Sequence, residues 1–260
     1  MSLRVAIAGA GGRMGQALIE ALGADRELEL GAALEAAGHP ALGREVSGVR
    51  IGSDVGAALR AADVLIDFTR PEGTIDHVRA CRQQGKAMVI GTTGFSAAQK
   101  KEIEEAARAI PLVMAANFAV GVNALYKLAE TAARILGEGY DVEIIEAHHR
   151  QKVDAPSGTA LHLGRILAEA LGRDLGKDAV FGRQGEVGAR PARQIGFHAV
   201  RGGDIVGEHT VLFAGLGERI ELTVRSQSRA TYASGALRAA RWVRGRKPGL
   251  YDMDDVLGLK

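Results

Sequence analysis

The first half of the chain alternates short apolar runs with stretches of helical composition. The apolar runs lie at residues 3–8, 28–34, 63–67, 87–90 and 112–115. Uninterrupted apolar character is typical of strands that are covered on both faces. Helices are predicted at residues 71–84 and 96–109, with Pro71 at a first helical position and Ser96 as an N-cap. Since crossovers between parallel strands are right-handed, this alternation predicts a parallel, doubly wound sheet.

The pattern changes after a predicted helix at residues 120–136. Residues 220–225 alternate apolar and polar side chains, which is the period of a sheet with one face in water. Residues 209–213 precede them across a turn at 214–217, so an antiparallel hairpin is expected. Two further strands are predicted, at residues 142–146 and 195–200.

These patterns predict an α/β protein with a Rossmann-like doubly wound parallel sheet and a second α+β domain on a mixed or antiparallel sheet. We expect a dinucleotide-binding domain at residues 1–118 plus 230–260, and a substrate-binding and oligomerisation domain at 119–229. The final helix, from residue 232 to about 243, would return to the first domain because chain ends commonly lie close together. Residues 172–194 are rich in glycine and charge, which predicts a long loop.

Composition narrows the classes of partner. The 260 residues are 47% hydrophobic and 25% charged, as in ordinary globular proteins. A net charge of +2 gives no electrostatic case for nucleic acid, and no apolar window is long enough to span a membrane. Cys81 is the only cysteine and the first residues do not form a secretory signal, so a cytoplasmic location is expected.

A glycine-rich turn follows the first apolar run. Residues 9–15 carry glycine at positions 9, 12 and 15, which allows a sharp turn and the close approach of a diphosphate to a helix start. Glu35 ends the second run, where an acid binds the hydroxyls of an adenine ribose. Ala36 follows it in place of an arginine that would pair with a 2′-phosphate, which favours NADH over NADPH. The alternative is that Arg13 in the glycine turn, or a residue further along, holds that phosphate. The alternative for Glu35 is a solvated loop carboxylate.

Three other predicted strands also end in small or polar residues, at 67–70, 91–94 and 116–118. In an open parallel sheet the ligand lies outside the carboxyl ends of the strands. One such end is explained by an ordinary turn, but three together predict loops that border a cofactor.

Residues 146–160 gather ionisable side chains between a predicted strand and a predicted helix. His148 and His149 are adjacent and should point to opposite sides of an extended strand, which argues against a metal site. Ser157 follows a proline and lacks the Gly-x-Ser-x-Gly context of a hydrolase nucleophile, so it is interpreted as a helix N-cap. Histidine, lysine and the N–H groups of a helix start suit proton transfer to an anionic substrate.

Several of these segments together closely resemble the dihydrodipicolinate reductase family of lysine biosynthesis. The matching segments are Gly-Ala-Gly-Gly-Arg-Met-Gly at 9–15, Asp-Phe-Thr-Arg-Pro-Glu at 67–72, Gly-Thr-Thr-Gly-Phe at 91–95, Ala-Ala-Asn-Phe at 115–118, Glu-Ala-His-His-x-x-Lys-x-Asp-Ala-Pro-Ser-Gly-Thr-Ala at 146–160 and Gly-Asp-Ile-Val-Gly-Glu-His-Thr at 203–210. They span nearly the whole chain, and the segment at 146–160 is long enough to be highly specific.

The resemblance implies NAD(P)H-dependent reduction of the dehydrated form of 4-hydroxy-tetrahydrodipicolinate, a small dicarboxylate, to tetrahydrodipicolinate. It implies that His148 is the general acid/base and Lys152 a proton donor, and that His149, Gly158 and Thr159 bind substrate. It places the cofactor at Gly9, Ala10, Gly11, Gly12, Arg13, Met14, Glu35, Gly91, Thr92, Thr93, Ala115, Ala116, Asn117 and Phe118. Many relatives have arginine where this chain has Ala36, and homotetramers are usual in the family.

Two alternative functions remain open from the residues alone. Another nicotinamide-dependent dehydrogenase of a small anionic substrate would share the first domain, but it leaves the paired histidines and Lys152 unexplained. A non-catalytic NAD(H)-binding redox sensor would need a DNA-binding or partner element, which the sequence does not reveal.

Overall fold

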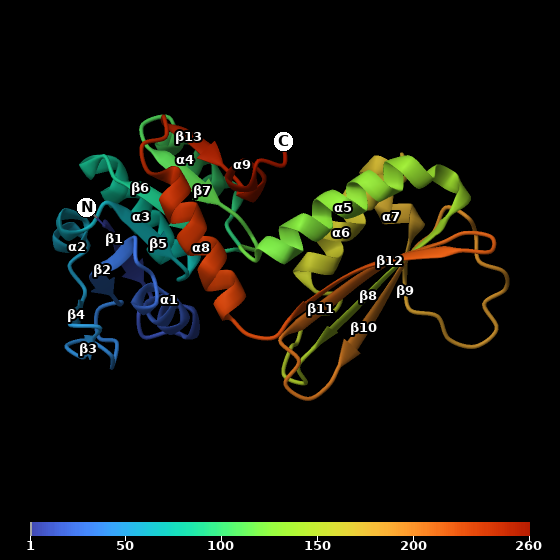
Figure 1. The fold of residues 1–260 in the computed structure, drawn as a ribbon, viewed down its shortest axis with the longest axis horizontal. Helices are drawn as coiled ribbons and strands as arrows, with labels where there is room; N and C mark the ends of the chain where they lie inside the picture. Colours follow the sequence, from blue (N-terminus) through green and yellow to red (C-terminus); the bar gives the residue numbers. More distant parts are fainter. Residues whose placement is uncertain (1) are drawn as a thin grey trace. The chain divides into compact units, whose positions relative to one another are not determined.

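The computed structural model describes residues 2–260, which form two compact units (Figure 1). The first unit contains the chain up to Val120 together with Arg229–Lys260. The second unit contains Gly121–Ser228. Each unit has its own sheet and its own hydrophobic core.

The first unit is built on an eight-stranded sheet with the order β13-β7-β6-β5-β1-β2-β4-β3. Its strands are β1 (Leu3–Ala8), β2 (Leu28–Leu34), β3 (Glu45–Val46), β4 (Val49–Gly52), β5 (Val64–Asp67), β6 (Ala87–Ile90), β7 (Pro111–Met114) and β13 (Gly249–Tyr251). Every neighbouring pair is parallel except β3 and β4, which are antiparallel. The predicted doubly wound parallel sheet is therefore confirmed.

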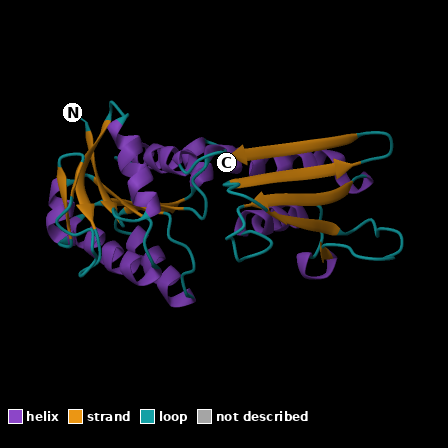
Figure 2. Cartoon of the chain, turned by 90° about the horizontal axis from the view of Figure 1, so that it is seen from below, coloured by secondary structure: helices purple, strands orange, loops and turns teal. Residues whose placement is uncertain are grey.

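Helices cover both sides of this sheet, as Figure 2 shows. They are α1 (Arg13–Gly23), α2 (Val55–Ala61), α3 (Pro71–Gln84), α4 (Ala97–Ala107), α8 (Ala230–Val243) and α9 (Met253–Leu257). Alternate side chains of β1 enter different cores: Val5 and Ile7 pack with α1 and α8, whereas Ala6 and Ala8 pack with α2, α3 and α4. Burial on both faces explains why the strand is almost continuously apolar.

The second unit has a mixed five-stranded sheet with the order β12-β11-β8-β10-β9. Its elements are α5 (Val120–Leu136), a 3-10 turn at Gly137–Gly139, β8 (Asp141–His148), α6 (Gly158–Ala170), α7 (Leu175–Asp178), β9 (Ala179–Phe181), β10 (Ile195–Arg201), β11 (Gly207–Ala214) and β12 (Arg219–Ser226). β11 runs antiparallel to β8 and β12, whereas β8, β9 and β10 are parallel. The predicted hairpin and the mixed sheet are confirmed.

One face of this sheet is buried under α5 and α6, which lie on the same side of it (Figure 1). Burial alternates along β8, with Val142, Ile144, Glu146 and His148 facing the helices. A carboxylate and an imidazole thus occupy positions that the strand period assigns to the core, which is the local reason for a site here.

The prediction of a continuous loop at residues 172–194 is wrong in part. The short helix α7 caps itself through the Asp174 side chain, and β9 extends the edge of the sheet beside β10. β9 has only three residues, too few for an alternating pattern to stand out. The sequence prediction also omitted α2, β3, β4, β13 and α9, which are short elements at the borders of the first unit.

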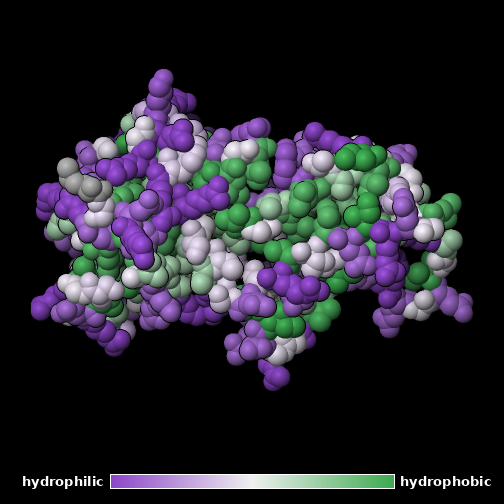
Figure 3. Space-filling view, viewed as in Figure 1, coloured by the Kyte–Doolittle hydropathy of each residue, from purple (hydrophilic) through white to green (hydrophobic). Residues whose placement is uncertain are grey.

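Hydrophobic side chains gather over α5 in Figure 3, where Leu128 and Ile135 are exposed. The opposite stripe of the helix carries Leu125, Ala129 and Ala133 into the core of the second unit. Among residues 2–260, no helix is both long enough and apolar enough to cross a membrane.

Candidate active site

The glycine turn leads directly from β1 into α1. Gly9 has φ +77°, which favours glycine, and the Gly12 N–H closes the turn on the Gly9 carbonyl at 2.9 Å. A side chain at Gly15 would overlap the Gly9 carbonyl, so the helix can approach the turn only with glycine there. No side chain caps α1 at its N-cap, Gly12. The helix start can therefore offer backbone N–H groups to a diphosphate.

Glu35 lies directly beside this turn. Its Oε1 accepts a hydrogen bond from the Gly11 N–H at 2.8 Å, and only 10% of its side chain is exposed. Gly9 and Ala10 also donate to the Leu34 carbonyl, so the turn rests on the end of β2. The carboxylate is thus fixed where the family resemblance expects ribose hydroxyls to bind.

A fully buried carboxylate, Asp67, joins the loops after β5 and β6. Its Oδ1 accepts hydrogen bonds from the hydroxyls of Thr69, Thr74 and Thr92 at 2.7, 3.1 and 3.1 Å. Its Oδ2 lies 2.5 Å from His77 Nδ1. Because one carboxylate holds residues from α3 and from two strand ends, the Thr92 side chain has a fixed position. The sequence placed Asp67 in a loop predicted to border the cofactor but gave it no role of its own, and His77 was not singled out.

Aromatic packing connects the next loop along the sheet. The Phe68 ring contacts the Phe118 ring edge-on at 5.6 Å between centroids, and a side chain at Gly91 would overlap the Phe68 ring. Phe118 is buried, so among the expected cofactor residues its side chain serves the core. Asn117 Oδ1 accepts from the Ala119 N–H at 2.8 Å and shapes the turn before α5.

The expected cofactor residues of the first unit therefore share one edge of the sheet. They follow β1, β2, β6 and β7, and these strands with β5 are neighbours in the order β7-β6-β5-β1-β2. Gly12, Arg13, Thr93 and Ala116 are exposed there, whereas Ala10 and Thr92 are buried. Exposed backbone beside the buried Asp67 and the partly buried Glu35 suits a dinucleotide.

In the second unit, His148 ends β8 with its ring held by a buried acid. His148 Nδ1 lies 2.6 Å from Glu146 Oε2, and Glu146 is 1% exposed. This bond assigns the proton of neutral His148 to Nδ1 and leaves Nε2 as the nitrogen that can exchange protons with a ligand. The arrangement is that of a general acid/base with an orienting carboxylate.

Lys152 lies on the loop between β8 and α6. Its Nζ donates to both carboxylate oxygens of Asp154, at 2.7 and 2.8 Å. Only 19% of the Lys152 side chain is exposed, whereas 55% of the Asp154 side chain is. The hydrogen bond from Lys152 lowers the pKa of Asp154, so the pair is an ion pair near neutral pH.

The start of α6 follows this loop. Ser157 is buried and its Oγ accepts from the Ala160 N–H at 3.2 Å, which confirms the predicted N-cap. Gly158 begins the helix and is exposed, and Thr159 is partly exposed. The Ser157 N–H itself donates to Glu146 Oε1 at 3.1 Å, so it is not available to a ligand. At the start of α6, the residues expected to bind an anion through backbone N–H groups are therefore Gly158 and Thr159.

His149 lies just beyond the end of β8, and its Nδ1 is buried without a hydrogen-bond partner. The sequence predicted that its side chain and that of His148 play different roles. An unpartnered imidazole nitrogen beside the loop that carries Lys152 suits a ligand contact.

Sequence reasoning missed two further residues around His148. Arg201, at the end of β10, binds both oxygens of Glu146 at 2.8 Å. His209, on β11, is 4% exposed, and its ring lies 5.2 Å from that of His148. The motif at residues 203–210 contains His209, so its resemblance to the family was an available signal. No local signal pointed to Arg201.

Burial and charge set the protonation of this cluster. Burial lowers the pKa of His148, and the bond to Glu146 offsets this only in part. Burial would raise the pKa of Glu146, but hydrogen bonds from Arg201 and His148 outweigh it and hold the pKa below its usual value. Burial beside His148 lowers the pKa of His209 to about 4, so His209 is neutral near pH 7.

Comparisons with known proteins give one consistent result. Residues 3–118 match the family described as dihydrodipicolinate reductase, N-terminus, and residues 121–257 match dihydrodipicolinate reductase, C-terminus. The 4-hydroxy-tetrahydrodipicolinate reductase of Aromatoleum aromaticum is 59% identical, with 100% of this chain and 97% of that protein covered. The enzyme of the same name from Thiobacillus denitrificans is 58% identical, with both chains covered completely.

A solved structure supports the same grouping. Dipicolinate-bound dihydrodipicolinate reductase from Paenisporosarcina sp. TG-14 is 29% identical and superposes with a TM-score of 0.81. The match covers 98% of this chain and 99% of that one.

Proposed function

This chain belongs to the dihydrodipicolinate reductase family. On that premise we propose which of its residues bind the cofactor, which bind the substrate and which transfer protons in one reaction. The chain is an NAD(P)H-dependent reductase that converts the dehydrated form of 4-hydroxy-tetrahydrodipicolinate to tetrahydrodipicolinate, in lysine and diaminopimelate biosynthesis. The family profiles account for both units, so neither a redox sensor nor a different dehydrogenase is needed to explain the chain.

The first unit binds the dinucleotide and the second binds substrate in this proposal. Gly9 to Met14 receive the diphosphate at the start of α1, and Glu35 receives the ribose hydroxyls. Gly91 to Thr93 and Ala115 to Phe118 border the rest of the cofactor along the same sheet edge. The nicotinamide supplies a hydride when the cofactor is bound. The fixed Glu35 carboxylate and Ala36 favour NADH, since a 2′-phosphate would meet the negative charge of Glu35 and residue 36 has no guanidinium to pair with it.

The observation that carries the catalytic assignment is the His148–Glu146 pair beside Lys152. Hydride delivery to a conjugated imine pushes negative charge towards the ring nitrogen, so a nearby acid lowers the barrier. Lys152 is cationic and supplies that proton, and His148 exchanges protons through Nε2. His149, Gly158 and Thr159 hold the ring carboxylates, together with the positive end of α6.

Coupled turnover tests the proposed function and the cofactor preference together. Freshly made 4-hydroxy-tetrahydrodipicolinate should support oxidation of both cofactors, with a higher kcat/KM for NADH than for NADPH. The measurement is the loss of absorbance of each reduced cofactor in parallel reactions. Folded protein that binds NADH without turning over this substrate contradicts the function, and a higher kcat/KM for NADPH contradicts the preference.

We further infer a homotetramer formed through the outer face of the five-stranded sheet. That face carries Ile145 and Val200, which are 37% and 49% exposed. Sedimentation velocity should give the mass of four chains, and Ile145→Glu should shift the protein to smaller species because it places a charge in the interface. Ile135→Glu, on the exposed side of α5, is the matched control and should leave the mass unchanged. A monomeric unaltered chain rejects this assembly.

The cytoplasmic location also stays a prediction, which cell fractionation tests.

A further inference from the structure

We propose that Arg201 is a positioning residue that sets the orientation of His148 and of the loop carrying Lys152 through one guanidinium group. The inference deepens the proposed function, because it assumes that His148 and Lys152 exchange protons with the substrate. Arg201 contacts neither side chain directly, so its action passes through Glu146 and through the Asp154 backbone.

The first contact fixes the carboxylate that orients His148. Arg201 Nη2 donates to Glu146 Oε1 and Nη1 donates to Oε2, both at 2.8 Å. The same Oε2 lies 2.6 Å from His148 Nδ1. A planar guanidinium that binds both carboxylate oxygens leaves the carboxylate little rotational freedom. The direction of the imidazole ring is fixed in turn, because Glu146 and His148 are both buried.

The second contact holds the loop that carries Lys152. Arg201 Nη2 also donates to the Asp154 carbonyl oxygen at 2.7 Å, and Lys152 Nζ binds the Asp154 carboxylate. Asp154 is therefore fixed at its backbone by Arg201 while its side chain holds the ammonium group. One residue of β10 thus links the end of β8 to the loop before α6. Loss of this link should let the loop move relative to His148.

The link also balances charge around the imidazole. The charged or titratable groups that face His148 are Glu146 on its own strand, Lys152 on the loop, Arg201 from β10 and His209 from β11. Glu146 favours the imidazolium form of His148, whereas Arg201 and Lys152 disfavour it. Removing Arg201 takes away one cation near His148 and leaves the Glu146 carboxylate held by the Ser157 N–H and His148 alone. Both effects should raise the pKa of His148.

Opposite shifts in His148 titration are the first test. NMR titration of the His148 ring, assigned by the signal lost in His148→Gln, should give a higher pKa in Arg201→Met and a lower pKa in Glu146→Gln. The Glu146 variant lowers it because the carboxylate that favours the imidazolium is gone while Arg201 remains. The Nδ1–H tautomer should dominate in the unaltered chain and mix with the other tautomer in Arg201→Met.

Kinetics are the second test. Arg201→Met should lower kcat by about 10- to 100-fold, the loss expected when reacting groups are displaced by about 1 Å, and should change KM less. Arg201→Lys keeps the charge but cannot bind both oxygens of Glu146. Its kcat should therefore lie between that of the unaltered chain and that of Arg201→Met, while the pKa of His148 stays near its original value. This variant decides the question where Arg201→Met does not fold.

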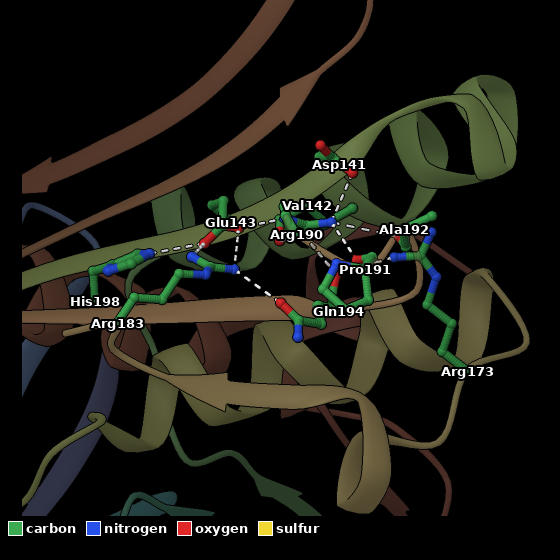
Figure 4. Close-up of polar contacts among 10 residues, drawn as sticks. All are labelled: Asp141, Val142, Glu143, Arg173, Arg183, Arg190, Pro191, Ala192, Gln194 and His198. Carbon is green, nitrogen blue, oxygen red and sulfur yellow. Dashed lines mark hydrogen bonds and ion pairs between the residues drawn. The ribbon is translucent and has the colours of Figure 1, made fainter. Parts of the chain in front are cut away.

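The same sheet contains a matched control, shown in Figure 4. Glu143 lies on β8, the same strand as Glu146, and Arg183 binds both of its carboxylate oxygens at 3.0 and 2.8 Å. The two pairs are alike in geometry, and the Arg183 side chain is 26% exposed against 20% for Arg201. Arg183→Met should lower the melting temperature without changing kcat or the titration of His148.

The outcomes separate the two proposals. The role of Arg201 is overturned if Arg201→Met changes neither the pKa of His148 nor kcat. It is also overturned if Arg183→Met changes both by as much as Arg201→Met does. An unaltered chain that does not reduce the substrate overturns the proposed function, whereas the NMR titration needs no substrate and still decides whether Arg201 positions His148.

Discussion

Replacement of His148 by glutamine should lower kcat by about 10²- to 10⁴-fold, the usual contribution of a general acid or base. Glutamine has nearly the same length and can still donate to Glu146, so the buried cluster should stay folded. The glutamine amide cannot gain and lose a proton near neutral pH, so the substitution removes only the acid/base capacity of the His148 imidazole. Steady-state turnover with saturating cofactor measures the effect, which should be larger in kcat than in KM for the substrate.

The sheet offers a control of the same residue type. His198 Nε2 lies 2.7 Å from Glu143 Oε2, so it also pairs with a glutamate on β8. His198→Gln should leave kcat unchanged, because this pair lies on the outer face of the sheet. A His148→Gln variant with nearly normal kcat would remove His148 from the proton-transfer step.

Lys152→Ala belongs to the same prediction and should lower kcat by about the same 10²- to 10⁴-fold factor. Its loss also frees the Asp154 carboxylate near the substrate carboxylates, so KM should rise as well. Lys177→Ala, an exposed lysine that pairs with Asp174, is the control. Because the two residues act on one transition state, the double variant should cost less than the product of the single effects.

Replacement of Glu35 by alanine should weaken NADH binding by about 10- to 100-fold. Hydrogen bonds to a charged group are worth about 1.5–3 kcal/mol, which corresponds to that range of affinity. NADPH affinity should fall less, because removal of the carboxylate also removes a negative charge beside the 2′-phosphate. Fluorescence titration of each reduced cofactor measures both affinities.

A control distinguishes ribose binding from support of the glycine turn, since Glu35 also accepts from the Gly11 N–H. Glu35→Gln keeps an oxygen that can accept from Gly11 but removes the charge, so it should restore the turn and leave NADPH affinity close to NADH affinity. Glu45→Ala, an exposed acid on β3, should change neither affinity. An equal loss of both affinities in Glu35→Ala would mean that Glu35 acts only through the turn.

The local pattern of the sequence was sufficient for most elements of the first unit. The predicted bounds of β1, β2, β6 and α3 agree with the structure, and Ser96 caps α4 with a reciprocal bond to Gln99. These features depend on residues close together in the chain: an apolar run, a cap or a glycine turn. β7 was predicted one residue too late, because its first residue is Pro111 and the apolar signal begins after it.

Elements without such a signal were missed or misjudged. β9 lies inside the segment predicted as a loop, and its pairing with β10 comes from contact rather than from its three residues. Arg190 holds the rest of that segment against Asp141 and Glu143, two acids on β8. Such contacts join residues almost 50 positions apart, and no local pattern records them.

The sequence alone determined the two kinds of sheet, the glycine turn with Glu35, and the segment at residues 146–160 that carries His148, Lys152 and the Ser157 cap. Only the tertiary structure decided what surrounds those residues: Arg201 lies 55 positions from Glu146, and His209 on β11 lies opposite Glu146 on β8 in the strand register. Strand register sets these neighbours, because hydrophobic periodicity encodes which face of a strand is buried but not which strand lies beside it. The segment therefore contains the groups that we propose to move protons, and the fold shows which groups hold them.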